Sequence, residues 1–178
     1  MSEKETGFEK KDLLILFASL FCGVAIIAAD QITKLLIKSR MVLGESRPFL
    51  KGFLEFSYIH NRGGAWGIFS GKTYILLFAT LLVMAVCVVL MIRFFKKNKL
   101  LLWAMVLVLS GGVGNMIDRI FRNGNVVDFL HFEFFPTFPV FNLADCAIVA
   151  GAGLLILYFL LDFLKAKKEK TETRDEDA

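Results

Sequence analysis

The chain has 178 residues, of which 56% are hydrophobic, and its mean hydropathy is +0.62. A soluble domain of this length could not hide that much apolar surface, so the composition predicts a membrane protein. The net charge is only +4, and the basic residues flank apolar runs instead of alternating with aromatic residues, which argues against a nucleic-acid partner. The three cysteines, Cys22, Cys87 and Cys146, are an odd number beside apolar segments and suggest no disulfide framework.

Four apolar segments are long enough to cross a hydrocarbon core, which requires about 20 helical residues. We predict spans at about 13–34, 74–92, 100–120 and 141–164, within a single membrane-embedded domain over residues 1–170. Four crossings put both termini on one side, and the basic clusters at 10–11, 93–99 and 165–170 make that side cytoplasmic. The long outer connection also carries basic residues, but at lower density. Residues 171–178 are predicted to form a disordered cytoplasmic tail.

The first apolar run has two interpretations. Lys10 and Lys11, followed by an apolar run and two small residues, could form a cleaved secretory signal. Asp30 and Lys34, however, continue the helical register past the run, and their i, i+4 spacing permits an ion pair at the membrane interface. We therefore expect a retained first span with a functional outer end.

The outer connection between the first two spans, at about residues 39–72, is predicted to contain a small extracellular sheet. Leu54, Phe56 and Tyr58 alternate with their neighbours, a period of two that is typical of a strand, and glycines flank this run. The other outer connection, residues 121–140, is rich in phenylalanine. We expect it to rest in the headgroup layer, as interfacial aromatic segments do.

Ionisable side chains at membrane depth are costly, so each one calls for a partner or a function. In the third span Asn115, Asp118 and Arg119 share one helical face. These residues could form a site, but a structural pair of Asp118 with Arg119, or a snorkelling arginine, explains them at least as well. The glycines one turn earlier would let another helix or a substrate backbone come close.

Asp128 and Asp145 are the candidate catalytic pair. Asp128 follows the third span, and Asp145 lies in the first turns of the fourth, so antiparallel packing of these spans would bring both carboxylates to similar depth. Two carboxylates that share a site cannot both ionise easily, so one can activate a water while the other protonates the leaving nitrogen of an amide. The alternative is that Asp145 only caps its helix and Asp128 is a solvated loop residue. Spacing alone leaves both open.

Thiol and metal mechanisms are less well supported. Cys146 and His131 could form a Cys–His pair, but adjacent helical residues point about 100° apart, so Cys146 faces away from Asp145. A buried membrane cysteine is the simpler interpretation. No metal-ligand spacing joins His60 and His131, the only histidines, and no phosphate-binding glycine loop is present, so we expect neither a metal nor a cofactor.

Five motifs occur in the order found in the lipoprotein signal peptidases, also called signal peptidase II, and the chain resembles that family. They are DQITK at 30–34, NRGGAW at 61–66, GGVGNMIDR at 111–119, VVDF at 126–129 and FPVFNLAD at 138–145. The second motif departs from the family pattern Asn-x-Gly-Ala-Ala-Phe, which affects the expected shape of that loop. The resemblance implies an all-α integral membrane protein with four transmembrane helices, a small extracellular β-cradle and an interfacial helix or loop.

The resemblance also implies an activity and a set of site residues. The activity is that of an aspartic endopeptidase of the bacterial cytoplasmic membrane, which cuts diacylglyceryl-modified prolipoproteins just before the lipid-bearing cysteine. Asp128 and Asp145 match the catalytic aspartates. Positions that match residues supporting the site, or binding substrate and the peptide antibiotic globomycin, are Asp30, Lys34, Asn61, Gly64, Asn115, Asp118, Arg119 and Asn142.

The expected partners are therefore a diacylated prolipoprotein, membrane lipids and globomycin, and we expect a monomer with its active site at the outer face. Two functions of other classes remain as alternatives. One is a small ion transporter or channel that uses the charged residues of the first and third spans, although the lack of charge in the middle of every span disfavours a path through the membrane. The other is a non-catalytic assembly factor that binds lipidated peptides, and a cleavage assay distinguishes it from a peptidase.

Overall fold

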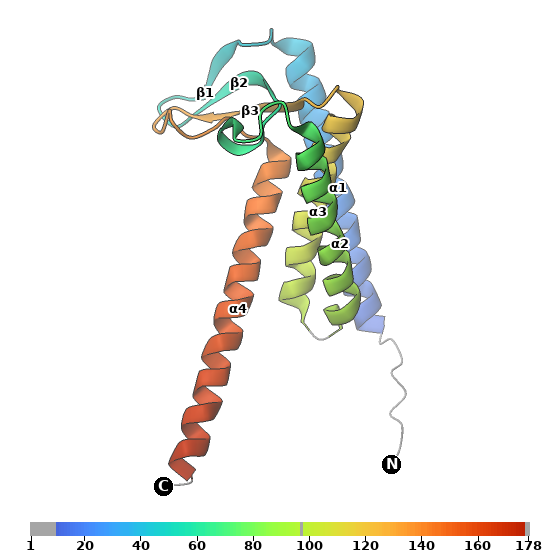
Figure 1. The fold of residues 1–178 in the computed structure, drawn as a ribbon, viewed down its shortest axis with the longest axis vertical. Coiled ribbons are helices and arrows are strands. Elements are labelled where there is room, and N and C mark those ends of the chain that lie inside the picture. The colour runs from blue at the N-terminus through green and yellow to red at the C-terminus, as the bar shows by residue number, and fades with distance from the viewer. Residues whose placement is uncertain (1–9, 97, 177–178) are drawn as a thin grey trace.

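The computed structural model describes residues 10–96 and 98–176. In chain order the elements are α1 (Lys10–Arg40), β1 (Ser46–Leu50), β2 (Leu54–Asn61), the 3-10 turn η1 (Ala65–Gly67), α2 (Thr73–Phe94), α3 (Lys99–Phe121), β3 (Val126–Phe132) and α4 (Leu143–Glu176). The sheet lies across one end of the helices (Figure 1). Helix α1 begins and α4 ends at the opposite end of the molecule, as expected for an even number of crossings.

Four helices are long and apolar enough to cross a membrane, and they coincide with the four predicted spans. Helix α3 is the central one, because 61% of its most apolar window is buried, against 6–11% in the other three. The outward faces carry exposed large apolar side chains such as Phe17, Phe78 and Phe159, which suit contact with lipid. Polar side chains on α3 are therefore held in the interior of the bundle.

The sheet has three antiparallel strands in the order β1-β2-β3. Strands β1 and β2 confirm the sheet predicted in the outer connection, and the only helical part of that connection among the described residues is the single turn η1. Strand β3 lies within residues 121–140, where we expected an apolar outer connection and did not predict a strand. Its residues Val126 to Phe129 are buried, and Ile59 of β2 pairs with Asp128. Pairing between strands so distant in sequence leaves no signal in local periodicity.

Helix α4 also differs from its prediction at the C-terminal end. Residues 171–176, which we expected to be disordered, continue the helix to Glu176, while residues 177–178 lie outside the described part of the chain. Residues 171–176 include two glutamates and one arginine, which are good helix formers, so they can extend a helix that is already nucleated in the membrane.

Glycines on α3 permit the close approach of α1 and α4 that the sequence suggested. A Cβ atom added to Gly111 would collide with the backbone carbonyl oxygen of Ala144 in α4. One added to Gly114 would lie 2.7 Å from Asp30 Oδ2 and 3.1 Å from Ala144 Cβ. The helices that carry the polar side chains are therefore packed against each other at the end nearest the sheet.

Gly114→Ala is expected to destabilise the protein by about 1–3 kcal/mol, because the added methyl group overpacks this contact and displaces Asp30. The thermal unfolding midpoint in micelles should fall. Gly153→Ala is the matched control, since a Cβ atom there meets nothing within 4 Å. An unchanged midpoint for Gly114→Ala would contradict the close packing.

Candidate active site

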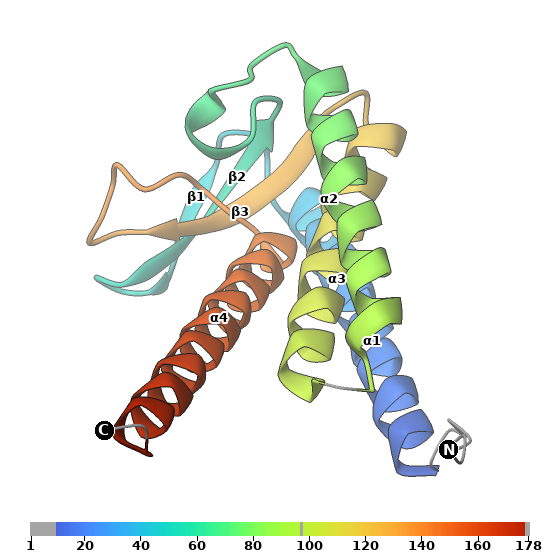
Figure 2. The same cartoon turned by 60° about the horizontal axis from the view of Figure 1, so that its bottom comes forward.

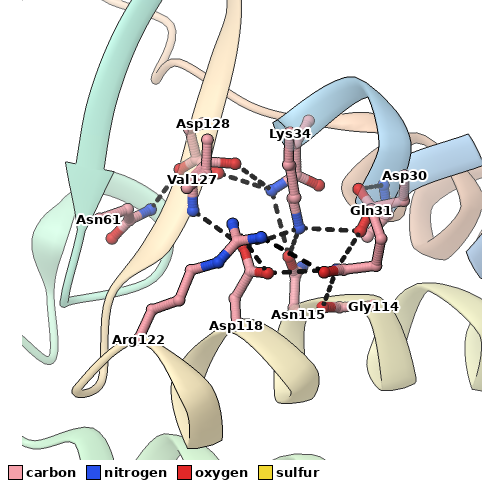
Figure 3. Close-up of polar contacts among 12 residues, drawn as sticks. Asp30, Gln31, Lys34, Asn61, Gly114, Asn115, Asp118, Arg122, Val127 and Asp128 are labelled. Carbon is pink, nitrogen blue, oxygen red and sulfur yellow. Dashed lines mark hydrogen bonds and ion pairs between the residues drawn. The ribbon is translucent and has the colours of Figure 1, made fainter. Parts of the chain in front are cut away.

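A fully buried lysine lies at the centre of the polar residues. Lys34 Nζ is 2.9 Å from Asp30 Oδ2, 3.1 Å from Asp118 Oδ2 and 3.2 Å from Asn115 Oδ1 (Figure 3). The i, i+4 pair of Asp30 with Lys34 is confirmed, and both side chains are completely buried inside the protein. Three oxygen atoms match the three N–H donors of an ammonium group, so this buried charge is fully satisfied.

Asp118 joins α1, α3 and β3 in the same network. Its Oδ2 accepts a hydrogen bond from the backbone N–H of Val127 at 3.0 Å, and its Oδ1 lies 3.2 Å from Arg122 and 3.1 Å from Gln31 Nε2 (Figure 3). Its ionic partners are therefore Lys34 and Arg122, and the structural pair with Arg119 is not formed. Sequence analysis missed Arg122 and Gln31, although Arg122 stands four residues after Asp118, a spacing that could have revealed it.

Asp128 is buried on β3 and accepts two amide hydrogen bonds. Asn61 Nδ2 donates to its Oδ2 at 2.8 Å, and Asn142 Nδ2 donates to its Oδ1 at 2.6 Å. Only 1% of the residue is exposed, so the alternative of a solvated loop residue was wrong. Burial, and next the negative charge of Asp145, raise the pKa of Asp128 to about 7, against the opposing effect of the two amides.

Asp145 lies in the first turn of α4 and contacts Asn115 and Asn142. Asn115 Nδ2 donates to its Oδ1 at 2.8 Å, and the backbone N–H of Asn142 donates to its Oδ2 at 3.1 Å. Asn142 Oδ1 accepts in return from the backbone N–H of Asp145, so the two residues form a reciprocal capping box. The helix-cap interpretation therefore holds, and it does not exclude a pair, because Asn142 hydrogen-bonds to both Asp128 and Asp145.

Both carboxylates line one cavity of about 780 Å³ between the sheet and the bundle. Of the site residues inferred from sequence, those that line it are Asn61, Gly64, Asn115, Arg119, Asp128 and Asp145. The others, Asp30, Lys34, Asp118 and Asn142, lie behind this wall, where each has hydrogen-bonding or ionic partners. Most of the remaining lining is apolar and comes from η1, the loop before α4, and α4 itself. The arrangement resembles a polar catalytic wall facing an apolar binding space.

The structure does not join Cys146 to His131. His131 Nδ1 lies 2.8 Å from Glu55 Oε1 on the neighbouring strand, away from the residues that line the cavity. Cys146 is exposed and lines the cavity, so the interpretation as a buried cysteine was wrong. Within the described residues, no group of three or more His, Cys, Asp or Glu side chains could hold a metal ion.

Cys146→Ala is expected to retain cleavage activity within about threefold of wild type, since removal of an exposed thiol changes barriers by less than about 1 kcal/mol. Initial rates on a diacylated prolipoprotein measure this. Loss of activity in a variant with an unchanged unfolding midpoint would revive a thiol mechanism.

Four membrane-spanning helices beneath a small sheet, with two carboxylates in the wall of one apolar cavity, define the class of an integral membrane peptidase. The model of the signal peptidase (SPase) II family matches residues 22–161, so the chain belongs to that family. It is 42% identical over 146 residues to the lipoprotein signal peptidase of Bacillus pumilus, which covers 82% of this chain and 94% of that protein. It is 39% identical over 137 residues to that of Clostridium acetobutylicum, covering 76% and 88% of the two chains.

Solved structures agree with this assignment. Two structures of a bacterial membrane enzyme determined by the in meso method, at 2.3 and 1.9 Å resolution, are each 34% identical to this chain. Their TM-scores are 0.74 and 0.70; the matches cover 82% and 80% of this chain, and 89% and 92% of the respective solved chains. The protein is thus a multi-pass membrane peptidase.

Proposed function

We propose that this protein is an aspartic endopeptidase that removes signal peptides from diacylglyceryl-modified prolipoproteins, with Asp128 and Asp145 as its catalytic pair. The relatives at about 40% identity are named lipoprotein signal peptidases. The main support for Asp128 and Asp145 as the pair is that Asn142 hydrogen-bonds to both carboxylates, which line one cavity. The two groups come from separate elements, β3 and α4.

The charge balance of the buried cluster supports one proton on the pair. When every group is ionised, four carboxylates face three cations, which leaves one negative charge in surroundings that disfavour it. One proton makes the cluster neutral. The carboxylates are those of Asp30, Asp118, Asp128 and Asp145, and the cations are Lys34, Arg119 and Arg122. The raised pKa of Asp128 agrees with a proton held there at neutral pH, although the pair titrates as a unit.

In this mechanism the ionised carboxylate takes a proton from a water molecule, which attacks the carbonyl carbon of the scissile bond. The protonated carboxylate gives its proton to the leaving nitrogen, so the pair again carries one proton after the bond breaks. Arg119 lines the same cavity, so its guanidinium group is within reach of a bound substrate. It can therefore donate to a substrate carbonyl oxygen, where negative charge develops during the attack.

The apolar part of the cavity suits an apolar signal segment. Its wall includes Phe138 from the loop before α4, and Ile148 and Val149 from the first turns of α4, so a substrate helix could lie along α4. The sheet lies across one end of the helices (Figure 2), and its residues Asn61 and Asp128 line the cavity. The basic clusters at 10–11 and 165–170 belong to the start of α1 and the C-terminal part of α4, toward the other end. We therefore propose a bacterial cytoplasmic membrane protein with both termini inside, its site at the outer face, and globomycin as an inhibitor in this cavity. We further propose that it acts as a monomer.

An ion path is less consistent with the described side chains. The half of the bundle away from the sheet is filled by an apolar cluster of Cys87, Leu101, Ala104, Met105 and Val108. The polar network is confined to the sheet end of the helices. The described residues therefore form no continuous polar path across the membrane.

The deciding experiment is a cleavage assay with purified protein and a diacylated prolipoprotein in micelles. Release of the signal peptide is expected, with the new N-terminus at the lipid-bearing cysteine. Binding without cleavage would support an assembly factor instead, and ion flux in liposomes without cleavage would support a channel.

The pH dependence follows from the shared proton. As pH rises through about 7, the pair loses that proton, the acid form disappears, and kcat/KM should fall about tenfold per pH unit above that point. As pH falls well below this value, the base takes up a second proton and the rate falls again. A profile of kcat/KM between pH 4 and 9 should therefore be bell-shaped, and a rate that stays constant up to pH 9 would contradict the shared proton.

A further inference from the structure

The sheet has a second polar feature on the face opposite the cavity. Successive side chains of a strand point to opposite faces. Asn61 of β2 lines the cavity, so its neighbour His60 points to the other face, as does Tyr58. That face packs on the end of α1, where Met41, Tyr58 and Val127 share one apolar cluster. His60 itself is exposed beside this contact.

Three cations from three elements surround His60. Lys38 lies in the last turn of α1, Arg62 follows β2, and Arg122 directly follows α3 as its C-terminal cap. Their charges, after partial burial of the ring, lower the pKa of His60, so the imidazole is neutral at pH 7. Asn125 ties two of these groups together, because its Oδ1 accepts from Arg62 Nε at 2.8 Å and its Nδ2 donates to the carbonyl oxygen of Arg122 at 2.8 Å.

Two of the three positive charges lack a carboxylate partner among the described residues. Arg122 is neutralised by Asp118, whereas the side-chain partner of Arg62 is the neutral amide of Asn125. Lys38 has no ion pair in the described structure. The acid of the adjoining turn, Glu45, is bound to Arg47. This surface therefore carries an excess of positive charge at the outer end of two membrane helices.

His60 adds a hydrogen-bond donor to these charges. Tyr58 Oη lies 3.0 Å from His60 Nε2, and burial raises the pKa of Tyr58, so the hydroxyl keeps its proton and can donate it to Nε2. A neutral imidazole that accepts at Nε2 carries its hydrogen on Nδ1. The described structure gives Nδ1 no acceptor, and His60 is exposed, so this donor is available to a ligand.

We propose that Lys38, His60 and Arg62 bind the phosphodiester of an anionic phospholipid headgroup in the outer leaflet. A phosphodiester offers two acceptor oxygens and one negative charge, which match one N–H donor and two cations. Its depth matches the headgroup layer, because the helices α1 and α3 end there and juxtamembrane cations attract anionic lipids. The site lies behind the sheet, so a bound lipid would hold the sheet on the membrane and leave the cavity open. The assignment to the outer leaflet depends on the proposed topology, whereas the assignment of a phosphodiester as the ligand does not.

Native mass spectrometry of the purified protein in dodecyl maltoside, titrated with phosphatidylglycerol, tests the proposal. Wild type should retain phosphatidylglycerol in preference to phosphatidylcholine. The double variant Lys38→Gln/Arg62→Gln should bind it at least about tenfold more weakly. The matched control Arg47→Gln/Lys51→Gln removes two cations from the region of β1 and should bind as wild type does. If the double variant does not fold, the single variants should each weaken binding by about fivefold.

Three results would overturn the inference. If the control variant binds phosphatidylglycerol as weakly as the double variant, the attraction is diffuse. If wild type retains phosphatidylcholine equally well, headgroup charge is not recognised. If inorganic phosphate displaces the lipid, the site binds the free ion. Cleavage of a diacylated prolipoprotein by the same preparations separates this inference from the proposed function. A double variant that loses the lipid but still cleaves supports the lipid site, and a wild-type protein that binds the lipid without cleaving contradicts only the peptidase proposal.

Discussion

Asp145→Asn and Asp128→Asn are each expected to lower kcat for cleavage of a diacylated prolipoprotein by about 10⁴-fold, the upper range for loss of a general acid or base. Asn has no proton to exchange at neutral pH, so neither the activation of water nor protonation of the leaving nitrogen can proceed. Asn is nearly isosteric and removes a buried negative charge, which offsets the one hydrogen bond lost where its amide nitrogen faces a donor. The fold should therefore survive, which the thermal unfolding midpoint in micelles can verify.

The matched control for these variants is Asp162→Asn, since Asp162 lies on the same helix as Asp145 but is exposed and does not line the cavity. Its turnover should equal that of wild type. Turnover near the wild-type level in either Asp128→Asn or Asp145→Asn would refute the catalytic pair.

Lys34→Met is expected to destabilise the protein by about 3–5 kcal/mol, the usual cost of removing one partner from a buried ion pair. Met has a similar length but leaves the carboxylates of Asp30 and Asp118 buried without their shared cation. It also removes a donor to Asn115 Oδ1, which helps to keep the amide nitrogen of Asn115 turned toward Asp145. Both the unfolding midpoint and cleavage activity should fall.

A second substitution tests the cause of that effect. Asp118 keeps its ion pair with Arg122 in Lys34→Met, whereas Asp30 loses the only cation it pairs with in the described structure. In Lys34→Met/Asp30→Asn that unpaired negative charge is gone, so part of the lost stability should return while activity stays low. Lys72→Met is the matched control, because Lys72 is exposed outside the helices. No recovery in the double variant, or equal loss in the control, would contradict the assigned role of the buried charge.

The amino-acid sequence by itself determined the parts of this protein that depend on local composition. Apolar runs of sufficient length predicted the four spans, because a membrane helix must satisfy its backbone internally and present apolar side chains to lipid. Alternation in residues 54–59 predicted strand β2, and the i, i+4 spacing predicted the pair of Asp30 with Lys34. Asp128 and Asp145 were candidates because a carboxylate at membrane depth requires a partner or a function.

Only the tertiary structure decided how these parts meet. Strand β3 exists because Val126–Phe132 pairs with β2, more than sixty residues earlier in the chain, and that pairing buries Asp128. Asn115 of α3 reaches Asp145 of α4 because the two helices pack closely at the glycines, and Asn142 reaches Asp128 because the start of α4 lies beside β3. The burial of Lys34, the partners of Asp118 and the cation cluster around His60 likewise depend on contacts between distant segments. Local periodicity contains no information about such contacts, since they arise only when separate apolar faces pack together.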